Sequence, residues 1–147
     1  MSDLDVRVKV AIYKHFAETG RRPEVRDVAQ RAGAGEGEVL AAFQSLRVQR
    51  LLWLEPDGET IRMAPPFSGV PTQHTVEAGG IDYFANCAWD ALGIPAALHE
   101  SARVRSRCEH SHEPLDLAVA LDGPEASDWL FHCLVPAAKW WDDLVFT

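Results

Sequence analysis

The sequence predicts an α+β protein, in which a winged-helix-like unit of three helices and a hairpin precedes a small antiparallel or mixed sheet packed with a helix. Three observations predict this class. Apolar residues recur at helical spacing near the N-terminus, alternating β-like runs follow residue 100, and a stretch with three prolines and three glycines lies between them. We therefore expect a winged-helix-like domain over 1–64, an extended connector over 65–80 and an α+β domain over 81–147.

The first three helices are expected from their apolar periodicity and from the glycines that follow them. The first helix carries its apolar side chains at Leu4, Val8, Ala11, Ile12 and Phe16. It should end at Gly20. Pro23 suits the first turn of the second helix, which should end near Gly33. The third helix follows the turn at 33–35, with apolar positions at Val39, Leu40, Phe43 and Leu46.

A hairpin is expected next, with strands over 51–54 and 60–63 around a tight turn at 55–58. Three helices and a hairpin are the outline of a winged helix-turn-helix, whose third helix enters the DNA major groove in DNA-binding proteins. Here that helix opens with Glu36 and Glu38, whose carboxylates would meet the phosphates. The pattern therefore disfavours DNA binding and favours a winged helix kept as a structural or interaction module.

The second half of the chain is expected to begin with the connector packed across the surface, because it contains apolar side chains. A helix is predicted over 81–93, and a short amphipathic stretch over 96–98 follows it. The β-like runs are then expected as strands over 102–105, 115–119 and 129–135. Turns are expected at 113–114 and 122–124.

Composition limits the classes of function. Hydrophobic residues make up 47% of the chain and charged residues 24%, a mixture that can bury a core. No apolar run approaches the length of a membrane span, and the acidic N-terminus lacks a secretory signal, so we expect a cytoplasmic protein without a membrane partner. Residues 1–64 are neutral and residues 65–147 carry the net charge of −8, which argues against a general nucleic-acid surface.

Cys87 and Asp90 are three residues apart on the predicted helix and should share one face. Burying an unpaired aspartate costs several kcal/mol, so this carboxylate needs a partner or a chemical purpose. The chemical hypothesis is a soft thiolate that binds a soft metal, with a neighbouring carboxylate that transfers a proton. Because the C-x-x-D spacing also arises by chance, a buried structural cysteine is the alternative.

Cys108, His110 and His112 form a second group of candidate metal ligands. At spacings of two residues they would lie on one face of a strand, where they could bind zinc or copper with His132 and Cys133 as further donors. The group lacks a standard zinc spacing, and a turn with surface histidines is the simpler interpretation.

Residues 83–96 resemble the active-site segment of organomercurial (alkylmercury) lyases. In that family an aromatic-rich approach leads to C-A-x-D and then to a short apolar stretch closed by Pro-Ala, as in YFANCAWDALGIPA here. Three further stretches match in the same order. Residues 65–71 resemble the connector of short family members, 106–108 the family's structural cysteine before a strand turn, and 140–147 the approach to its second catalytic cysteine. A winged-helix-like N-terminal region is also a family feature.

The resemblance implies protonolysis of a carbon–mercury bond. Two cysteine thiolates capture the organomercurial, a carboxylate protonates the leaving carbon, and Hg(II) passes to an external thiol. Carried over to this chain, Cys87 is the first mercury thiolate and Asp90 the proton donor. The implied partner is a small organomercurial or another soft-metal ligand. No resident cofactor is expected, since mercury is substrate and product and the external thiol is a co-substrate.

Two departures from the family pattern leave alternatives open. The second cysteine should lie at Thr147 or immediately after it, and neither Cys108 nor Cys133 matches its position, so the chain resembles a short variant lacking that cysteine. Asn86 stands where the best-known members carry an aromatic residue. The alternatives are a ligand- or metal-responsive winged-helix regulator and a non-catalytic, thiol-dependent binding relative. The neutral charge of residues 1–64 counts against the regulator.

Overall fold

The computed structural model describes residues 1–146 and confirms the α+β class. The three predicted helices are present as α1 (Asp3–Thr19), α2 (Val25–Ala32) and α3 (Glu36–Val48). Ser2 and Asp5 cap the start of α1 reciprocally, each side chain accepting a hydrogen bond from the other's backbone N–H. Gly20 ends α1 in the left-handed conformation, at φ 68°, and donates its N–H to the carbonyl of Phe16. Local sequence signals therefore account for these helices.

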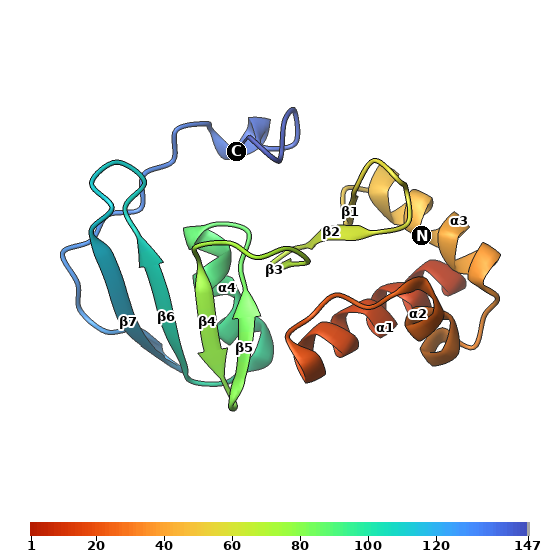
Figure 1. Cartoon of the computed structure of the whole chain (residues 1–147), viewed down its shortest axis with the longest axis horizontal. Coiled ribbons are helices and arrows are strands. Elements are labelled where there is room, and N and C mark those ends of the chain that lie inside the picture. The colour runs from red at the N-terminus through yellow and green to blue at the C-terminus, as the bar shows by residue number, and fades with distance from the viewer. Residues whose placement is uncertain (147) are drawn as a thin grey trace.

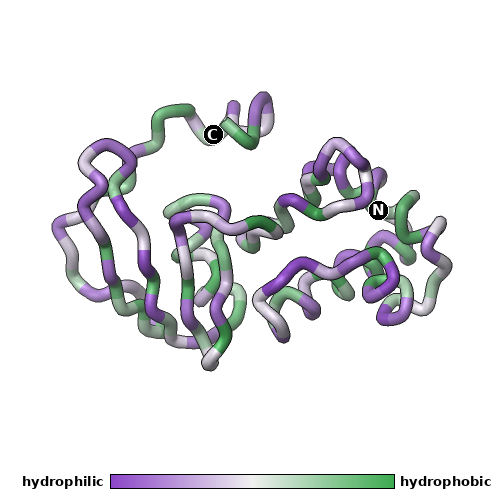
Figure 2. Tube along the Cα trace, viewed as in Figure 1, coloured by the Kyte–Doolittle hydropathy of each residue, from purple (hydrophilic) through white to green (hydrophobic). Residues whose placement is uncertain are grey.

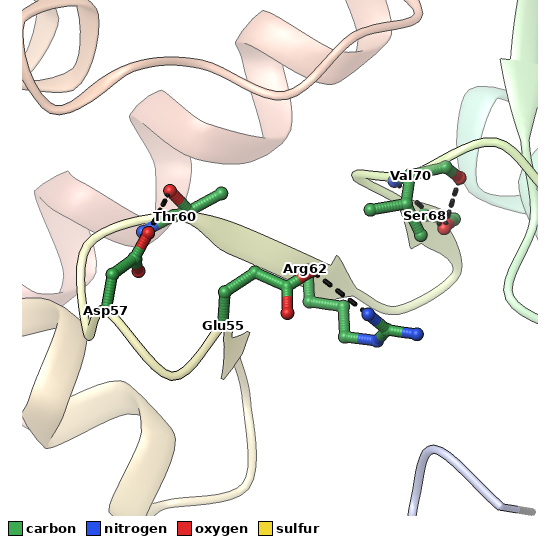
Figure 3. A network of polar contacts seen from close by, with 6 residues as sticks. All are labelled: Glu55, Asp57, Thr60, Arg62, Ser68 and Val70. Atoms are coloured by element: carbon green, nitrogen blue, oxygen red, sulfur yellow. Dashed lines mark hydrogen bonds and ion pairs between the residues drawn. The ribbon is translucent and has the colours of Figure 1, made fainter.

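A three-stranded antiparallel sheet of order β1-β2-β3 follows the helices. Its strands are β1 (Trp53–Leu54), β2 (Ile61–Ala64) and β3 (Phe67–Ser68). The first two strands form the predicted hairpin. The carboxylate of Asp57 accepts hydrogen bonds from the backbone N–H and hydroxyl of Thr60 in the turn, and Arg62 forms an ion pair with Glu55 at 3.0 Å (Figure 3). These contacts brace the hairpin that leads into β3.

The larger sheet has five antiparallel strands in the order β5-β4-β6-β7-β8. The strands are β4 (Thr75–Ala78), β5 (Ile81–Phe84), β6 (Ala102–Arg107), β7 (Pro114–Ala120) and β8 (Gly123–Pro124). Helix α4 (Ala88–Leu98) packs against β4 and β6, as Figure 1 shows. Hydrophilic and hydrophobic residues alternate along β6 (Figure 2), so that Val104 is buried while Arg103 and Arg105 face solvent.

The helix predicted over 81–93 is wrong at both ends. Residues 81–84 form β5, because Gly79 and Gly80 adopt positive φ angles of 57° and 77° and close a tight hairpin between β4 and β5. The helix begins only at Ala88. It continues past Gly93 to Leu98 with Pro95 inside it, because its apolar face is buried against the sheet.

Two further predictions need correction. Part of the predicted connector at 65–80 is regular structure, since it supplies β3 and also β4, which lies between two other strands. Val76 and Ala78 face the core from β4, and this burial holds the strand in place. The strand predicted over 129–135 is absent, and only a short 3₁₀ helix, Ala137–Lys139, follows. Leu130 is 90% exposed, so no burial favours a strand there.

The helical unit and the larger sheet meet at Phe67. Its ring stacks on Phe16 of α1 with centroids 5.3 Å apart, and it also contacts Tyr83 of β5 at 5.7 Å. The hydroxyl of Tyr83 donates a hydrogen bond to the carbonyl of Ala17 at 2.7 Å. These contacts join α1, β3 and β5 in one core. Within residues 1–146, no helix is long and apolar enough to cross a membrane.

Candidate functional site

The structure brings Cys87 and Asp90 together at the start of α4. Cys87 is the N-cap residue, with extended backbone at φ −151° and ψ 179°, and its carbonyl accepts the hydrogen bond of Ala91 at 3.0 Å. Cys87 therefore precedes the helix, which corrects its predicted place within it. Asp90 lies in the first helical turn. Both side chains are half-buried. A helix N-terminus favours negative charge, which suits a thiolate that forms there.

Asn86 connects this turn to the neighbouring strand. Its side-chain Nδ2 donates to Oδ2 of Asp90 at 2.9 Å and lies 3.3 Å from the carbonyl oxygens of both Pro66 and Phe67. In the sequence, Asn86 stands out only as a departure from a family pattern, which does not indicate this contact. The spacing of four residues between an asparagine and an aspartate across a helix start could have indicated it.

Burial determines the electrostatics of the pair. It raises the pKa of the Cys87 thiol, an effect that the backbone N–H groups of Asp90 and Trp89 partly oppose and that the charges of Asp90 and Cys133 reinforce. Burial also raises the pKa of Asp90, against the hydrogen bond from Asn86. The site therefore holds a neutral thiol next to a carboxyl group that keeps its proton to a higher pH than an exposed one.

The pKa of Cys87 can be tested by its alkylation. In a Cys108→Ser, Cys133→Ser variant, iodoacetamide should react with Cys87 with a midpoint at higher pH than with a free cysteine peptide, because only the thiolate reacts and burial delays its formation. Rates measured from pH 6 to 10 by mass spectrometry give the midpoint. In urea the midpoint should fall to that of the peptide. A folded-state midpoint at or below the peptide's would contradict the burial effect.

Helix α1 contributes Tyr13 to the same region. Its hydroxyl donates a hydrogen bond to the carbonyl of Pro65 at 2.8 Å, next to the turn that Asn86 contacts. Burial, together with the charge of Asp90, raises the pKa of Tyr13 to about 12, so the phenol stays neutral at physiological pH. The N-terminal helical unit therefore supports the segment at 65–67 that Asn86 contacts.

Tyr13→Phe removes this support without removing the ring. We expect the free energy of unfolding to fall by about 1 kcal/mol, because the Pro65 carbonyl loses its donor while the packing of the ring stays. Urea denaturation followed by circular dichroism measures the change. An unchanged free energy of unfolding would show that water replaces the phenol at no cost.

The other predicted ligands do not form a site. Cys108, His110 and His112 lie in the turn between β6 and β7, where the N–H of His112 donates to the Cys108 carbonyl at 2.9 Å. They are not on a strand, so the expected common face does not exist. Cys133 lies in the irregular segment after β8, where its Sγ donates to the carbonyl of Val135. Within residues 1–146, no three His, Cys, Asp or Glu side chains are grouped to hold a metal ion.

One expected position cannot be placed in the structure. Thr147, at or after which the second cysteine was expected, lies outside the described residues. The chemistry that the described structure supports therefore centres on the Cys87 thiol, the Asp90 carboxyl group and the Asn86 amide. The Cys133 thiol lies near enough for its charge to add to the rise that burial causes in the pKa of Cys87.

Comparisons with known proteins identify the family that the chain resembles. The family model for alkylmercury lyase matches residues 67–147, a range that includes the whole Cys87–Asp90 segment. Alkylmercury lyases of Bacillus cereus and Clostridium butyricum are each 28% identical to the chain over 103 residues, which is 70% of this chain and 45% of each relative. The chain thus spans about half the length of these relatives.

A solved structure shares the fold. The crystal structure of the mercury-bound form of MerB2 superposes with a TM-score of 0.62 at 20% sequence identity, covering 87% of this chain and 68% of that one. At this identity the likeness concerns the fold alone.

Proposed function

Because the chain belongs to the alkylmercury lyase family, we propose that it cleaves carbon–mercury bonds by protonolysis, with Cys87 as the mercury-binding thiolate and Asp90 as the proton donor. The observation that carries this proposal is the placement of Cys87 and Asp90, both half-buried, at the N-terminus of α4, where burial and the charge of Asp90 raise the pKa of the Cys87 thiol. Asn86 holds the carboxyl group through a 2.9 Å hydrogen bond. The pair thus supplies a soft ligand for mercury and a proton for the leaving carbon.

Capture comes first. The mercury atom of R–Hg⁺ bonds to the sulfur of Cys87, and the thiol proton leaves to solvent, giving R–Hg–S. Mercury is soft and selects thiolate over oxygen ligands, and metal binding drives the deprotonation that burial otherwise opposes. The partial positive charge at the N-terminus of α4 stabilises the negative charge that develops on sulfur during capture.

The second step is cleavage of the carbon–mercury bond, for which the carboxyl group supplies the proton. Asp90 transfers its proton to the carbon bound to mercury, and the electron pair of the carbon–mercury bond becomes the new carbon–hydrogen bond. The hydrocarbon leaves, mercury stays on the Cys87 sulfur, and Asp90 becomes a carboxylate. Two external thiol molecules then take Hg(II) as its bis-thiolate complex. The sulfur–mercury bond to Cys87 breaks, one thiol proton returns to the Cys87 sulfur, the other leaves to solvent, and solvent reprotonates Asp90. The raised pKa of Asp90 increases the protonated fraction near neutral pH.

The direct test of this function is hydrocarbon release. The full-length protein is incubated with phenylmercury acetate and an excess of a small thiol. Benzene is measured by gas chromatography. We expect benzene in proportion to protein concentration, over many turnovers. Phenylmercury bound without benzene above the protein-free rate would contradict the proposal and would indicate a binding-only relative.

A further inference from the structure

The side-chain amide of Asn86 donates a hydrogen bond to one of the two carboxyl oxygens of Asp90. We propose that Asn86 is a positioning residue that fixes the Asp90 carboxyl group to the Pro66–Phe67 backbone through Oδ2, so that the proton delivered to the substrate carbon is carried on Oδ1. This inference rests on the proposed function for its chemistry. Its geometric part, the fixing of Asp90 by Asn86, can be tested without any turnover.

The orientation of the Asn86 amide follows from its neighbours. Oxygen and nitrogen of an asparagine amide look alike, so the hydrogen-bond network has to assign them. The carbonyl oxygens of Pro66 and Phe67, both 3.3 Å from Nδ2, can only accept hydrogen bonds. A flipped amide would place its own oxygen against these two acceptors. The amino group therefore faces Pro66, Phe67 and Asp90.

The other end of the amide supports a positioning role. Oδ1 of Asn86 is buried and finds no hydrogen-bond partner in the described part of the chain. A buried acceptor without a donor destabilises a fold. An apolar side chain at position 86 would avoid this cost, but it would also leave Oδ2 of Asp90 without the amide donor. Asparagine at position 86 therefore leaves its own Oδ1 without a hydrogen bond but keeps the Asp90 carboxyl group in place through Nδ2.

The contact also distinguishes the two oxygens of Asp90. A neutral carboxyl group has one hydroxyl oxygen and one carbonyl oxygen, and the carbonyl oxygen is the better hydrogen-bond acceptor. Oδ2 accepts from Asn86, so the proton belongs on Oδ1. Within residues 1–146, the hydrogen bond to Asn86 is the only one that the Asp90 side chain makes. Oδ1 is therefore the oxygen left to face a substrate carbon.

The kinetic test compares three variants at one position. Asn86→Leu keeps the approximate volume and removes the donor, Asn86→Asp replaces the donor with an acceptor, and Asn86→Gln retains the amide. We expect kcat for benzene release to fall about 100-fold in the first two and to recover at least tenfold in Asn86→Gln, because small misplacements of a reacting group cost about this much. KM and the stoichiometry of phenylmercury bound to Cys87 should stay unchanged. A rise in KM with unchanged kcat would assign Asn86 to substrate binding and overturn the proposal.

A structural readout separates this inference from the proposed function. Crystal structures of Asn86→Leu and Asn86→Gln should show the Asp90 carboxyl group turned away from Pro66 in the first and retained in the second. If Asn86→Leu does not fold, the side-chain amide signals of Asn86 in nuclear magnetic resonance spectra should shift on Asp90→Ala instead. An unmoved carboxyl group, or unmoved amide signals, would overturn the inference even if the protein is a lyase. A moved carboxyl group in a protein that releases no benzene would retain the positioning and reject only the lyase chemistry.

Discussion

Cys87→Ser is expected to reduce hydrocarbon release from phenylmercury to the protein-free rate and, in a Cys108→Ser, Cys133→Ser background, to abolish the phenylmercury adduct. A serine hydroxyl is a hard ligand that stays protonated at neutral pH, so it does not bind soft mercury as a thiolate does. The fold should persist, because Cys87 is the N-cap of α4 and serine is a preferred N-cap residue. Loss of activity with unchanged or increased stability would therefore locate the effect in the chemistry of the sulfur.

The matched control for this substitution is another half-buried thiol of the same chain. Cys108→Ser changes a cysteine in the turn between β6 and β7, which the structure does not bring into the site. Gas chromatography gives the benzene and intact-protein mass spectrometry gives the adduct. With Cys133→Ser in both proteins, we expect benzene release to persist in the Cys108→Ser protein, whose remaining thiol is Cys87, and to be lost in the Cys87→Ser protein, whose adduct can form only at Cys108. Benzene release by Cys87→Ser at the wild-type rate would show that a different thiol binds the mercury.

Phe67→Ala is expected to lower the free energy of unfolding by about 3–5 kcal/mol, the usual cost of truncating a buried aromatic side chain. Phe67 is 2% exposed and packs against Phe16 and Tyr83, so its loss opens a cavity between α1, β3 and β5. The effect should reach the site, because the Phe67 carbonyl also accepts from Asn86. A marginally stable variant should therefore release less benzene, relative to the wild-type protein, at 37 °C than at 15 °C.

Urea denaturation measures this change against a phenylalanine that lacks such packing. Phe146 is 71% exposed, and Phe146→Ala should alter the free energy of unfolding by no more than about 0.5 kcal/mol. Similar losses in the two variants would mean that Phe67 does not join the helical unit to the sheet. A large loss confined to Phe67→Ala would support one shared core.

Local signals predicted the first half of the fold better than the second. The helices before residue 50 combine apolar periodicity with glycine stops, and both signals act within a few residues. The misassigned strands depend on partners far along the chain. Thr75–Ala78 has only four residues and lies in a stretch rich in proline and glycine, so its pairing with β5 and β6 had no local signature. Gly79 and Gly80 close a hairpin, although glycines in such a stretch are typical of a linker.

The residues of the candidate site also differ in how well the sequence predicts them. The family resemblance found Cys87 and Asp90 because both lie in one short motif. Asn86 and Tyr13 were missed because their roles depend on the turn at 65–67, which tertiary packing brings next to α4. The sequence also predicts a helix from residue 81, which places Cys87 inside it. Because residues 81–84 form β5 instead, Cys87 is the N-cap of α4.

A single-turnover experiment on Asp90→Asn tests the central claim most directly. Asparagine keeps the shape and can still accept the hydrogen bond from Asn86, but it has no acidic proton to give. Equimolar phenylmercury is added, and adduct and benzene are followed together. The proposed chemistry predicts a persistent phenylmercury adduct on Cys87 and benzene release slowed about 100-fold or more relative to the wild-type protein. Benzene release by Asp90→Asn at the wild-type rate would contradict the assignment of Asp90 as the proton donor.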